Sequence, residues 1–395
     1  MTGPGIVTGT VVVCGAGAAG MAAALAAARA GAPVCLVEAR PKLGGTVTHS
    51  FIHTLAGLYD SAGELLNDGL ARELAQTLLK SNASTCKRRL GRAYVLGVDP
   101  DVYQALVEQW IRQEPQIHVL RNSQVCGASR SGDLLEELDV TTPDGAMRLR
   151  PKAVVDATGS GAVAELVDAA LLRDSPTRAA GGLIFTMRGV VPEAVKFPRG
   201  LAILRALREA AADGMLPPDC GKTWIDSGVH EDEIYVKLFV PLSDDWREPE
   251  SQGEINRGAL RTQAAVVAFL TKRPEFSEAA VCRTGTLGIR DGGRVYGEYC
   301  LTADDVRKTR KFEDSACRCC WPIEYWDPRE GVSLEYLPEG SWYDIPLRAL
   351  KVKGFSNFWV AGKCLSADPL AQASARCVGT CWSMGEAVGR AAALL

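Results

Sequence analysis

Three glycines near the N-terminus constrain the fold of this chain more than any other feature. Gly15, Gly17 and Gly20 have the spacing G-x-G-x-x-G, and they stand between a β-branched run and an alanine-rich run. A strand that ends in such a turn and continues into a helix lets the backbone approach a pyrophosphate, and the first N–H groups of the helix are free to bind it. The pattern predicts a strand, a helix and a second strand over residues 10–38, and hence a layered α/β sheet. A glycine-rich turn that binds nothing is the structural alternative.

The second strand of this unit ends in an acidic residue. Glu38 follows Gly20 by 18 positions, and a carboxylate at this place can accept hydrogen bonds from both ribose hydroxyls of an adenosine. The same carboxylate repels a 2′-phosphate, which disfavours NADP. These residues therefore predict a dinucleotide site, but they leave the choice between NAD and FAD open.

Later segments carry a resemblance to known flavoproteins. Gly44 and Gly45 follow Glu38 within EARPKLGG, which resembles the Glu-x-x-x-x-x-Gly-Gly extension of the flavoproteins related to glutathione reductase. The segment VVDATGSG at 154–161 resembles their Asp-Ala-Thr-Gly segment, and residues 357–394 resemble their closing flavin segment. The resemblance favours FAD over NAD.

The middle of the chain narrows the resemblance further. Residues 286–306, 315–327 and 341–350 are similar to a bacterial group of FAD-dependent oxidoreductases. That group is itself distantly similar to fumarate reductase and to xanthan-lyase-associated flavoproteins. The resemblance implies a Rossmann-like FAD-binding domain, but it does not identify a substrate because the group is chemically diverse.

The resemblance also assigns parts of the cofactor to particular residues. It implies that Glu38 meets the adenosine, that the glycine turn meets the pyrophosphate, and that the backbone of Val125 faces the adenine. Lys363 stands where many relatives have an aspartate for the ribityl hydroxyls, and Asp368 is the nearby substitute. The cofactor-binding residues expected in this way are Gly15, Gly17, Ala18, Ala19, Gly20, Glu38, Ala39, Arg40, Gly44, Gly45, Thr46, Val125, Ala157, Thr158, Gly159, Gly362, Asp368 and Ala373.

Charge and cysteine content limit the partners and the compartment. Lys and Arg number 44 against 47 Asp and Glu, a formal charge of −3, so no overall basic field attracts nucleic acid or anionic lipid. The 13 cysteines are an odd number, and residues 1–10 lack the pattern of a secretory signal, so we expect a cytoplasmic protein with free thiols. Residues 11–37 are nearly uncharged, but their glycines and Pro33 argue against a membrane span.

A change of composition and strand pattern along the chain predicts a discontinuous FAD-binding domain with an insertion. Residues 1–180 and 350–395 form that domain, and the inserted 181–349 form a mixed-sheet domain on the substrate side, where aromatic residues concentrate. Helices are expected over residues 67–80, 101–113, 201–212, 254–272 and 378–395. Strands are expected over 117–120, 124–128, 153–156, 183–187, 233–241, 281–299 and 358–362, with a hairpin over 134–149.

Two arginines are candidates for holding a substrate. Arg290 and Arg294 flank a glycine turn, and a guanidinium can grip a carboxylate with two parallel hydrogen bonds. We expect Arg290 to contact the substrate or the pyrimidine edge of the flavin. A solvated or salt-bridged pair of arginines is the alternative. Tyr299 and Arg376 are further candidates close to the reaction.

His49 and His53 are the candidates for acid or base chemistry. They closely follow Gly45, and the chain has only four histidines. Covalent attachment of the flavin and ordinary hydrogen bonding are the alternatives for both. Cys317 and Cys320 have the C-x-x-C spacing, but no second pair completes a zinc site and the surroundings do not resemble a thioredoxin motif. We therefore expect no metal site.

The sequence as a whole predicts an FAD-dependent dehydrogenase or oxidase. Such an enzyme removes a hydride from a small organic substrate, and flavin N5 accepts it. Because no second G-x-G-x-x-G is present to hold NAD(P)H, the electrons should pass to oxygen or to a small-molecule or protein acceptor. An NAD(P)H-loaded reductase or monooxygenase and a nucleotide-binding protein without redox activity are the alternatives.

Overall fold

The larger part of the chain is built on a seven-stranded sheet. The computed structural model describes residues 6–173, 178–196 and 198–395, so residues 1–5, which entered the expectation about a secretory signal, lie outside it. The strand order is β6-β2-β1-β9-β8-β7, with β18 beside β9. Strands β6, β2, β1, β9 and β18 are parallel, and β7, β8 and β9 form an antiparallel meander. The strands are β1 (Ile6–Cys14), β2 (Val34–Glu38), β6 (Ile117–Arg121), β7 (Gln124–Ser131), β8 (Leu134–Thr142), β9 (Gly145–Asp156) and β18 (Phe358–Val360).

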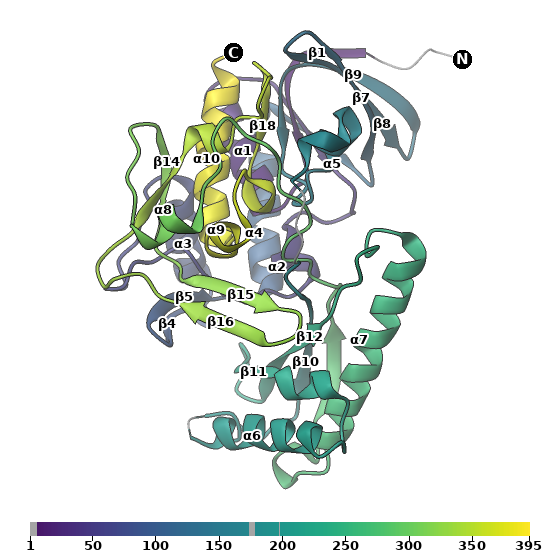
Figure 1. Cartoon of the computed structure of the whole chain (residues 1–395), viewed down its shortest axis with the longest axis vertical. Helices are drawn as coiled ribbons and strands as arrows, with labels where there is room; N and C mark the ends of the chain where they lie inside the picture. The colour runs from purple at the N-terminus through teal and green to yellow at the C-terminus, as the bar shows by residue number, and fades with distance from the viewer. Residues whose placement is uncertain (1–5, 174–177, 197) are drawn as a thin grey trace.

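Two small-residue helices cover one face of this sheet. Helix α1 (Ala18–Arg29) and helix α10 (Val378–Ala393) lie side by side, although they come from opposite ends of the chain (Figure 1). A Cβ atom at Gly385 would lie 2.0 Å from the carbonyl oxygen of Ala19, and one at Gly389 would lie 2.2 Å from that of Ala23. Alanine and glycine are therefore needed here because the two helix backbones are in direct contact.

The remaining elements of the larger part surround this core. The helices are α2 (Gly45–His49), α3 (Leu70–Ser81), α4 (Pro100–Gln113), α5 (Ala162–Val167), α8 (Ala303–Arg307) and α9 (Pro369–Ala375). A three-stranded sheet has the order β3 (Thr54–Leu55), β5 (Ala93–Gly97) and β4 (Cys86–Leu90). Two further strand pairs are β14 (Ser315–Cys319) with β17 (Tyr343–Pro346), and β15 (Ile323–Asp327) with β16 (Gly331–Glu335).

The smaller part of the chain has a sheet and a core of its own. The sheet has the order β11 (Trp224–Ser227), β12 (Glu233–Val240), β10 (Gly181–Arg188) and β13 (Ala280–Thr284), and all neighbours are antiparallel. Helices α6 (Arg199–Ala212) and α7 (Pro249–Leu270) belong to the same part (Figure 1). The inward side chains, among them Phe185, Val236 and Leu238, form a separate apolar cluster.

The expected insertion covers more residues than this second sheet uses. We expected residues 181–349 to form one unit, but the second sheet ends at Thr284. Buried side chains beyond residue 300, among them Leu301, Trp321 and Tyr343, pack in the core of the larger part. The hairpin of β15 and β16 lies at the boundary between the two parts (Figure 1). The structure thus places residues 301–349 with the FAD-binding domain rather than with the inserted sheet.

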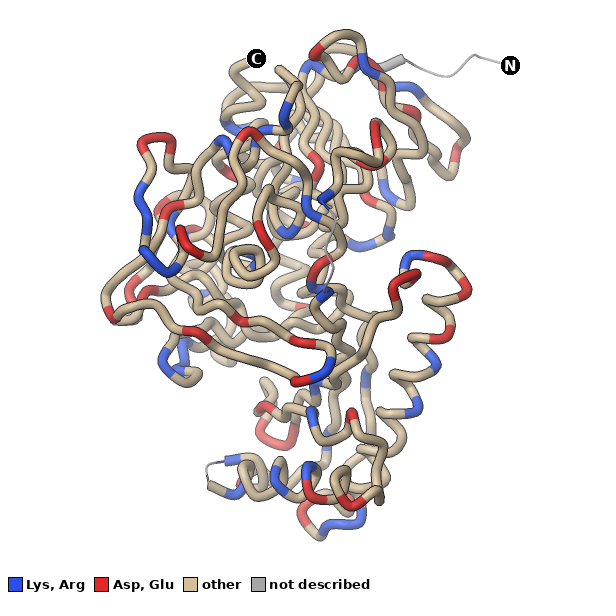
Figure 2. The backbone as a smooth tube through the Cα atoms, in the orientation of Figure 1, with Lys and Arg blue, Asp and Glu red and all other residues tan. Residues whose placement is uncertain are grey.

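Most of the expected helices and strands are present, but the predicted extent of one strand is wrong. The strand expected over residues 281–299 ends at Thr284, because the glycine-rich segment beyond it makes only isolated pairings, such as Gly182 with Gly288. Among the described residues, no helix is both long and apolar enough to cross a membrane. Charged residues of both signs are interspersed over both parts of the chain (Figure 2).

Candidate active site

The candidate site is a cavity of about 480 Å³ at the carboxyl ends of the central parallel strands. Its wall consists of the glycine turn before α1, helix α2, the loops after β9 and β18, and part of residues 286–292. In open parallel sheets, ligands bind outside the carboxyl ends of the strands. The fold therefore places the glycine turn where a ligand is expected.

Most of the sequence-predicted site residues line this cavity. They come from six separate stretches of the chain, which the fold brings together. They are Gly15, Gly17, Ala18, Ala19, Glu38, Ala39, Arg40, Gly45, Thr46, His49, Val125, Ala157, Thr158, Gly159, Gly362 and Arg376.

The three glycines of the turn have different structural roles. Gly15 has a φ of +96°, and a Cβ atom there would lie 2.7 Å from the carbonyl oxygen of Ala157. A Cβ atom at Gly20 would lie 1.7 Å from the carbonyl oxygen of Gly15. At Gly17, in contrast, φ is −77° and a Cβ atom would meet only the Cα of Gly45, at 3.9 Å. Gly15 and Gly20 are thus required by the fold itself, whereas Gly17 presents bare backbone to the cavity.

Glu38 closes the turn at the end of β2. Its carboxylate accepts hydrogen bonds from the amide of Ala16 at 2.7 Å and from the amide of Arg40 at 2.9 Å. A carboxylate offers about four lone-pair directions, so these two bonds orient it and leave acceptor capacity toward the cavity. The backbone then reaches α2 through Gly44, which caps the helix with a φ of +113°.

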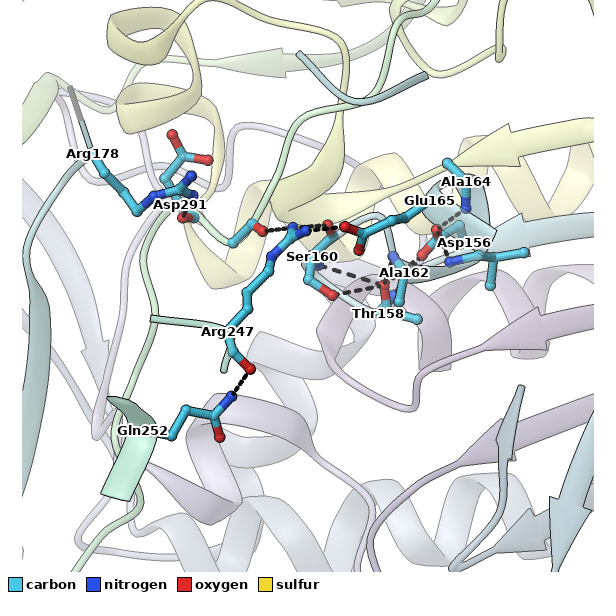
Figure 3. Close-up of polar contacts among 12 residues, drawn as sticks. Asp156, Thr158, Ser160, Ala162, Ala164, Glu165, Arg178, Arg247, Gln252 and Asp291 are labelled. Carbon is cyan, nitrogen blue, oxygen red and sulfur yellow. Dashed lines mark hydrogen bonds and ion pairs between the residues drawn. The ribbon is translucent and has the colours of Figure 1, made fainter. Parts of the chain in front are cut away.

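The loop after β9 also lines the cavity, and Figure 3 shows its polar contacts. Asp156 is fully buried and accepts hydrogen bonds from the side chain of Thr158 at 2.6 Å and from the amide of Val163 at 2.9 Å. Burial raises the pKa of Asp156, while these hydrogen bonds oppose that shift. Arg247, from the smaller part, donates to Glu165 at 2.5 Å and to the carbonyl oxygen of Ser160 at 3.1 Å. Arg247 therefore ties the second part of the chain to the rim of the cavity.

Two basic side chains from the segment after β18 line the cavity. Lys363 lines the cavity, and its ammonium group donates to the carbonyl oxygen of Ile289 at 2.6 Å. Arg376 also lines it and donates to the carbonyl oxygen of Glu324 at 3.1 Å. Burial lowers the pKa of Lys363. Both cations are therefore held by neutral carbonyl groups.

The two histidines lie in different surroundings. His49 lines the cavity, its Nε2 lies 3.0 Å from the carbonyl oxygen of Lys42, and partial burial lowers its pKa. The chain then turns at Phe51, where φ is +53°. His53 consequently points away from the cavity and is stacked on Tyr235, with 3.7 Å between the ring centroids. The expectation that His53 lies beside the cofactor is not met, because this turn directs it to the junction between the two parts.

Three other expected residues have structural contacts elsewhere. The hydroxyl of Tyr299 donates to Asp305 at 2.8 Å. Asp368 caps α9 by accepting from the amide of Ala371 at 2.8 Å, and its other oxygen accepts from the amide of Ala303 at 2.6 Å. Ala373 is buried in α9 within the core. Neither Tyr299 nor Asp368 is among the cavity residues, so Asp368 does not substitute there for the missing aspartate.

Arg290 lies behind the cavity wall. Its Nη1 donates to the carbonyl oxygens of Ala180 and Gly181, each at 2.6 Å, and its guanidinium stacks on Trp326 at 3.8 Å from the ring centroid. Burial, followed by the charge of Arg376, lowers the pKa of Arg290 to about 9. Arg290 therefore faces the junction between the two parts. Gly20 and Gly44 likewise support the wall without lining it.

The comparisons with known proteins agree with this geometry. The family described as FAD dependent oxidoreductase matches residues 10–395. The chain belongs to this family. FAD is accordingly its cofactor, and the predicted fold class, a Rossmann-like FAD-binding fold, is confirmed. The distant likeness to fumarate reductase and xanthan-lyase-associated flavoproteins stays a prediction.

A solved structure of low sequence identity shares the fold, and others are similar over part of the chain. A geranylgeranyl bacteriochlorophyll reductase-like protein from Thermoplasma acidophilum has a TM-score of 0.51 at 13% identity, over 99% of this chain and 78% of that chain. The myxobacterial halogenase CndH has a TM-score of 0.48 at 12% identity, over 95% and 72%. The p-nitrophenol 4-monooxygenase PnpA from Pseudomonas putida DLL-E4 has 0.40 at 13%, over 74% and 70%. A search of curated proteins finds no match.

The residues present fit FAD. The bare backbone at Gly17, the oriented carboxylate of Glu38 and the free amides at the start of α1 suit a pyrophosphate and a ribose. Thr46, Gly45 and Val125 line the same cavity as Glu38. These residues would hold the cofactor, and their individual roles stay predictions.

Several residues that line the cavity were not predicted from the sequence. Ser50, Ser160, Trp246 and the segment 286–289 all line the cavity. The amide of Thr286 donates to the carbonyl oxygen of His49 at 2.7 Å, which attaches the segment to α2. The segment lies within a stretch whose family resemblance was visible in the sequence, but its contact with α2 depends on the long-range fold.

Proposed function

We propose that this oxidoreductase oxidises or dehydrogenates a small organic substrate. FAD, when bound, would accept the hydride, and oxygen or another acceptor would then take up the electrons. The observation that carries the proposal is the contact between the cavity wall and the second sheet. The amide of Gly285 donates to the carbonyl oxygen of Ile184 at 2.8 Å, and Gly182 and Gly288 exchange hydrogen bonds of 3.0 and 2.8 Å. Strand β10 is thereby joined to the segment that lines the cavity.

A small molecule bound at this contact would lie against the cofactor. One side of the junction belongs to the FAD-binding sheet, and the other belongs to a sheet with its own core. Sites between two such units are common positions for small-molecule binding. FAD, when bound, supplies a two-electron acceptor for hydride.

The chain's own residues supply charge and a proton-accepting group. The lowered pKa of His49 favours the neutral imidazole, whose Nε2–H can donate to the carbonyl oxygen of Lys42 and leave Nδ1 as an acceptor. Lys363 and Arg376 place two positive charges on the cavity wall. Positive charge there stabilises negative charge that develops during reduction.

Anaerobic reduction of the bound flavin tests this function. Candidate organic substrates, NADH and NADPH are mixed separately with the oxidised holoenzyme, and the visible flavin absorption is followed. Loss of the absorption with an organic substrate, but not with either nicotinamide nucleotide, supports the proposal. Rapid loss with NADPH or NADH would instead favour a reductase or monooxygenase, and a flavin that no organic substrate reduces would contradict the proposal.

The setting of this activity is also a proposal. The thirteen cysteines are all free thiols, and free thiols are typical of a reducing compartment. We therefore propose a cytoplasmic enzyme whose partners are a small-molecule substrate and an electron acceptor. Burial raises the pKa of Cys320, whose thiol donates to the carbonyl oxygen of Tyr59, and this does not suit a reactive dithiol.

A further inference from the structure

The junction between the two parts of the chain is lined with charged and aromatic side chains. On β12, Ile234, Val236 and Leu238 point into the core of the second sheet. The alternate residues therefore face the larger part. Tyr235 stacks on His53 of that part, and Lys237 lies between the two parts.

Lys237 has only distant partners at this junction. Its ammonium group lies 3.5 Å from the hydroxyl of Thr54 and 3.9 Å from Asp226. The same Asp226 oxygen is already shared by Nε2 of His53 at 3.2 Å and by Arg88 at 2.8 Å. The carboxylate of Asp226 is thus shared by His53, Arg88 and Lys237, and its contact with Lys237 is the longest.

Two neighbouring arginines, Arg290 and Arg376, are held by carbonyl groups rather than by acids. Within the described part of the chain, Arg290 and Arg376 have no carboxylate oxygen within 4.0 Å, and both donate to carbonyl groups instead. Both oxygens of Glu324 accept hydrogen bonds from indole N–H groups, of Trp321 at 2.9 Å and of Trp326 at 2.7 Å. The Nε atom of Arg376 is buried and has no partner in the described chain.

The charges at the junction do not balance. Arg88, Lys237, Arg290 and Arg376 are cationic, whereas Asp226 and Glu324 are the nearby acids that act on them. Burial of a charge without a partner is costly. Burial lowers the pKa of Lys237, with the opposing charge of Asp226 only partly compensating. The junction therefore favours an incoming negative charge.

Lys237 is nevertheless accessible. Its side chain keeps 19% of its surface exposed, and Arg290, Trp326 and Arg376 are half-buried rather than enclosed. Arg376 also lines the cofactor cavity, so the junction and the cavity share a wall. A small molecule held at the junction would thus lie next to the cofactor site.

We propose that this junction binds an organic carboxylate, with Lys237, Arg290 and Arg376 as the groups that attract its negative charge. The inference rests on the proposed function in making that carboxylate the substrate, and it names the substrate class as carboxylic acids. The indole of Trp326, already stacked on Arg290 and lying 6.4 Å from the ring of Phe239, gives an aromatic surface for the rest of the molecule. Lys237 is assigned as a specificity-determining residue.

The test compares acids with their neutral amides on the oxidised holoenzyme. Acetate, succinate and benzoate are titrated by calorimetry, each beside its amide, acetamide, succinamide and benzamide. At least one acid should bind at least tenfold more tightly than its amide, because a hydrogen bond to a charged group is stronger than a neutral one. Equal affinities, or no binding by any of the three acids, would overturn the proposal without the need for a variant.

Variants then locate the charge. Lys237→Met should weaken acid binding at least tenfold and leave amide binding unchanged, and Lys237→Arg should retain most of the acid affinity. The control is Lys196→Met, because Lys196 is an exposed lysine of the same part, paired with exposed Glu193. Wild-type acid affinity in Lys237→Met would refute the assignment, as would an equal loss in Lys237→Arg with the melting temperature and FAD content unchanged.

The binding test is separate from the test of function, because it needs no turnover. Acids that bind through Lys237, in an enzyme whose flavin no organic substrate reduces anaerobically, would support the anion site and contradict the proposed function. Amines or alcohols that reduce the flavin, in an enzyme that binds no acid, would support the function and contradict the anion site.

Discussion

Replacing Gly17 with alanine should weaken FAD binding while the protein stays folded. Gly17 has φ −77° and ψ −173°, a conformation open to alanine, and the added Cβ would meet only the Cα of Gly45 at 3.9 Å. Replacing glycine with alanine makes the unfolded chain less flexible, which stabilises the folded protein by about 0.4–1 kcal/mol. This gain offsets a similar loss of stability from placing alanine at a helix N-cap. The net change in the free energy of unfolding without FAD should therefore stay within about 1 kcal/mol.

The cost to the cofactor is larger. A methyl group on this backbone holds the pyrophosphate away from the start of α1 and disrupts at least one hydrogen bond to a charged group. Such a bond contributes about 1.5–3 kcal/mol, so the dissociation constant of FAD should rise roughly tenfold to 150-fold. Isothermal titration of the apo-protein with FAD measures this change directly.

Two further glycine substitutions serve as comparisons. Gly258→Ala lies in α7, where a Cβ would meet only a side-chain nitrogen of Arg261 at 3.9 Å, so FAD affinity should be unchanged. Gly20→Ala places a Cβ 1.7 Å from the carbonyl oxygen of Gly15 and should impair folding. Wild-type FAD affinity in Gly17→Ala would refute the placement of the pyrophosphate at this turn.

Three other outcomes follow from the structure. Burial lowers the pKa of His53 from 6.5 to about 4, so the unfolded chain binds more protons than the folded chain between these pH values. The free energy of unfolding should therefore fall by up to about 3 kcal/mol as the pH drops from 6.5 to 4. In urea unfolding, His53→Gln should lose this part of the pH dependence of stability. Glu38→Gln removes the charge at the ribose and should weaken FAD binding by about tenfold, measured by titration; an unchanged affinity would count against Glu38 as the ribose acceptor. Burial raises the pKa of Cys381 to about 12, so iodoacetamide at neutral pH should alkylate exposed Cys282 and spare Cys381 in the folded enzyme, as peptide mass spectrometry would show; equal modification would contradict this order.

The dinucleotide-binding half of the fold was predictable because its pattern is local. Gly15, Gly17, Gly20 and Glu38 lie within one strand, helix, strand unit. Two of the contacts behind this pattern are made inside the unit, between Gly20 and Gly15 and between Glu38 and the amide of Ala16. The closing helix was also predictable, since its small residues suit close packing on α1. In these regions neighbouring residues determine the structure.

The rest of the site depends on contacts between distant residues. His53 lies only four positions after His49, yet the turn at Phe51 and the ring of Tyr235 place it at the junction. Asp368 caps α9, and the amide of Ala303, which belongs to a distant segment, donates to its second oxygen. Such outcomes depend on which segments meet, and no short sequence pattern encodes them.

The domain boundary was misplaced for a related reason. Residues 301–349 share the aromatic composition of the second part, but their buried side chains complete the core of the first. Composition describes what a segment can bury, and it does not tell which of two cores receives it. The charged junction was missed as well, because Lys237, Asp226 and Arg88 come from three different strands.

Anaerobic mixing of the oxidised holoenzyme with organic acids tests the central claim most directly. The claim is that this FAD-dependent oxidoreductase takes a hydride from a small organic substrate held beside the cavity. At least one organic acid should abolish the visible flavin absorption, and NADH and NADPH should leave it unchanged. Rapid reduction by a nicotinamide nucleotide, with no reduction by any organic substrate, would contradict the claim.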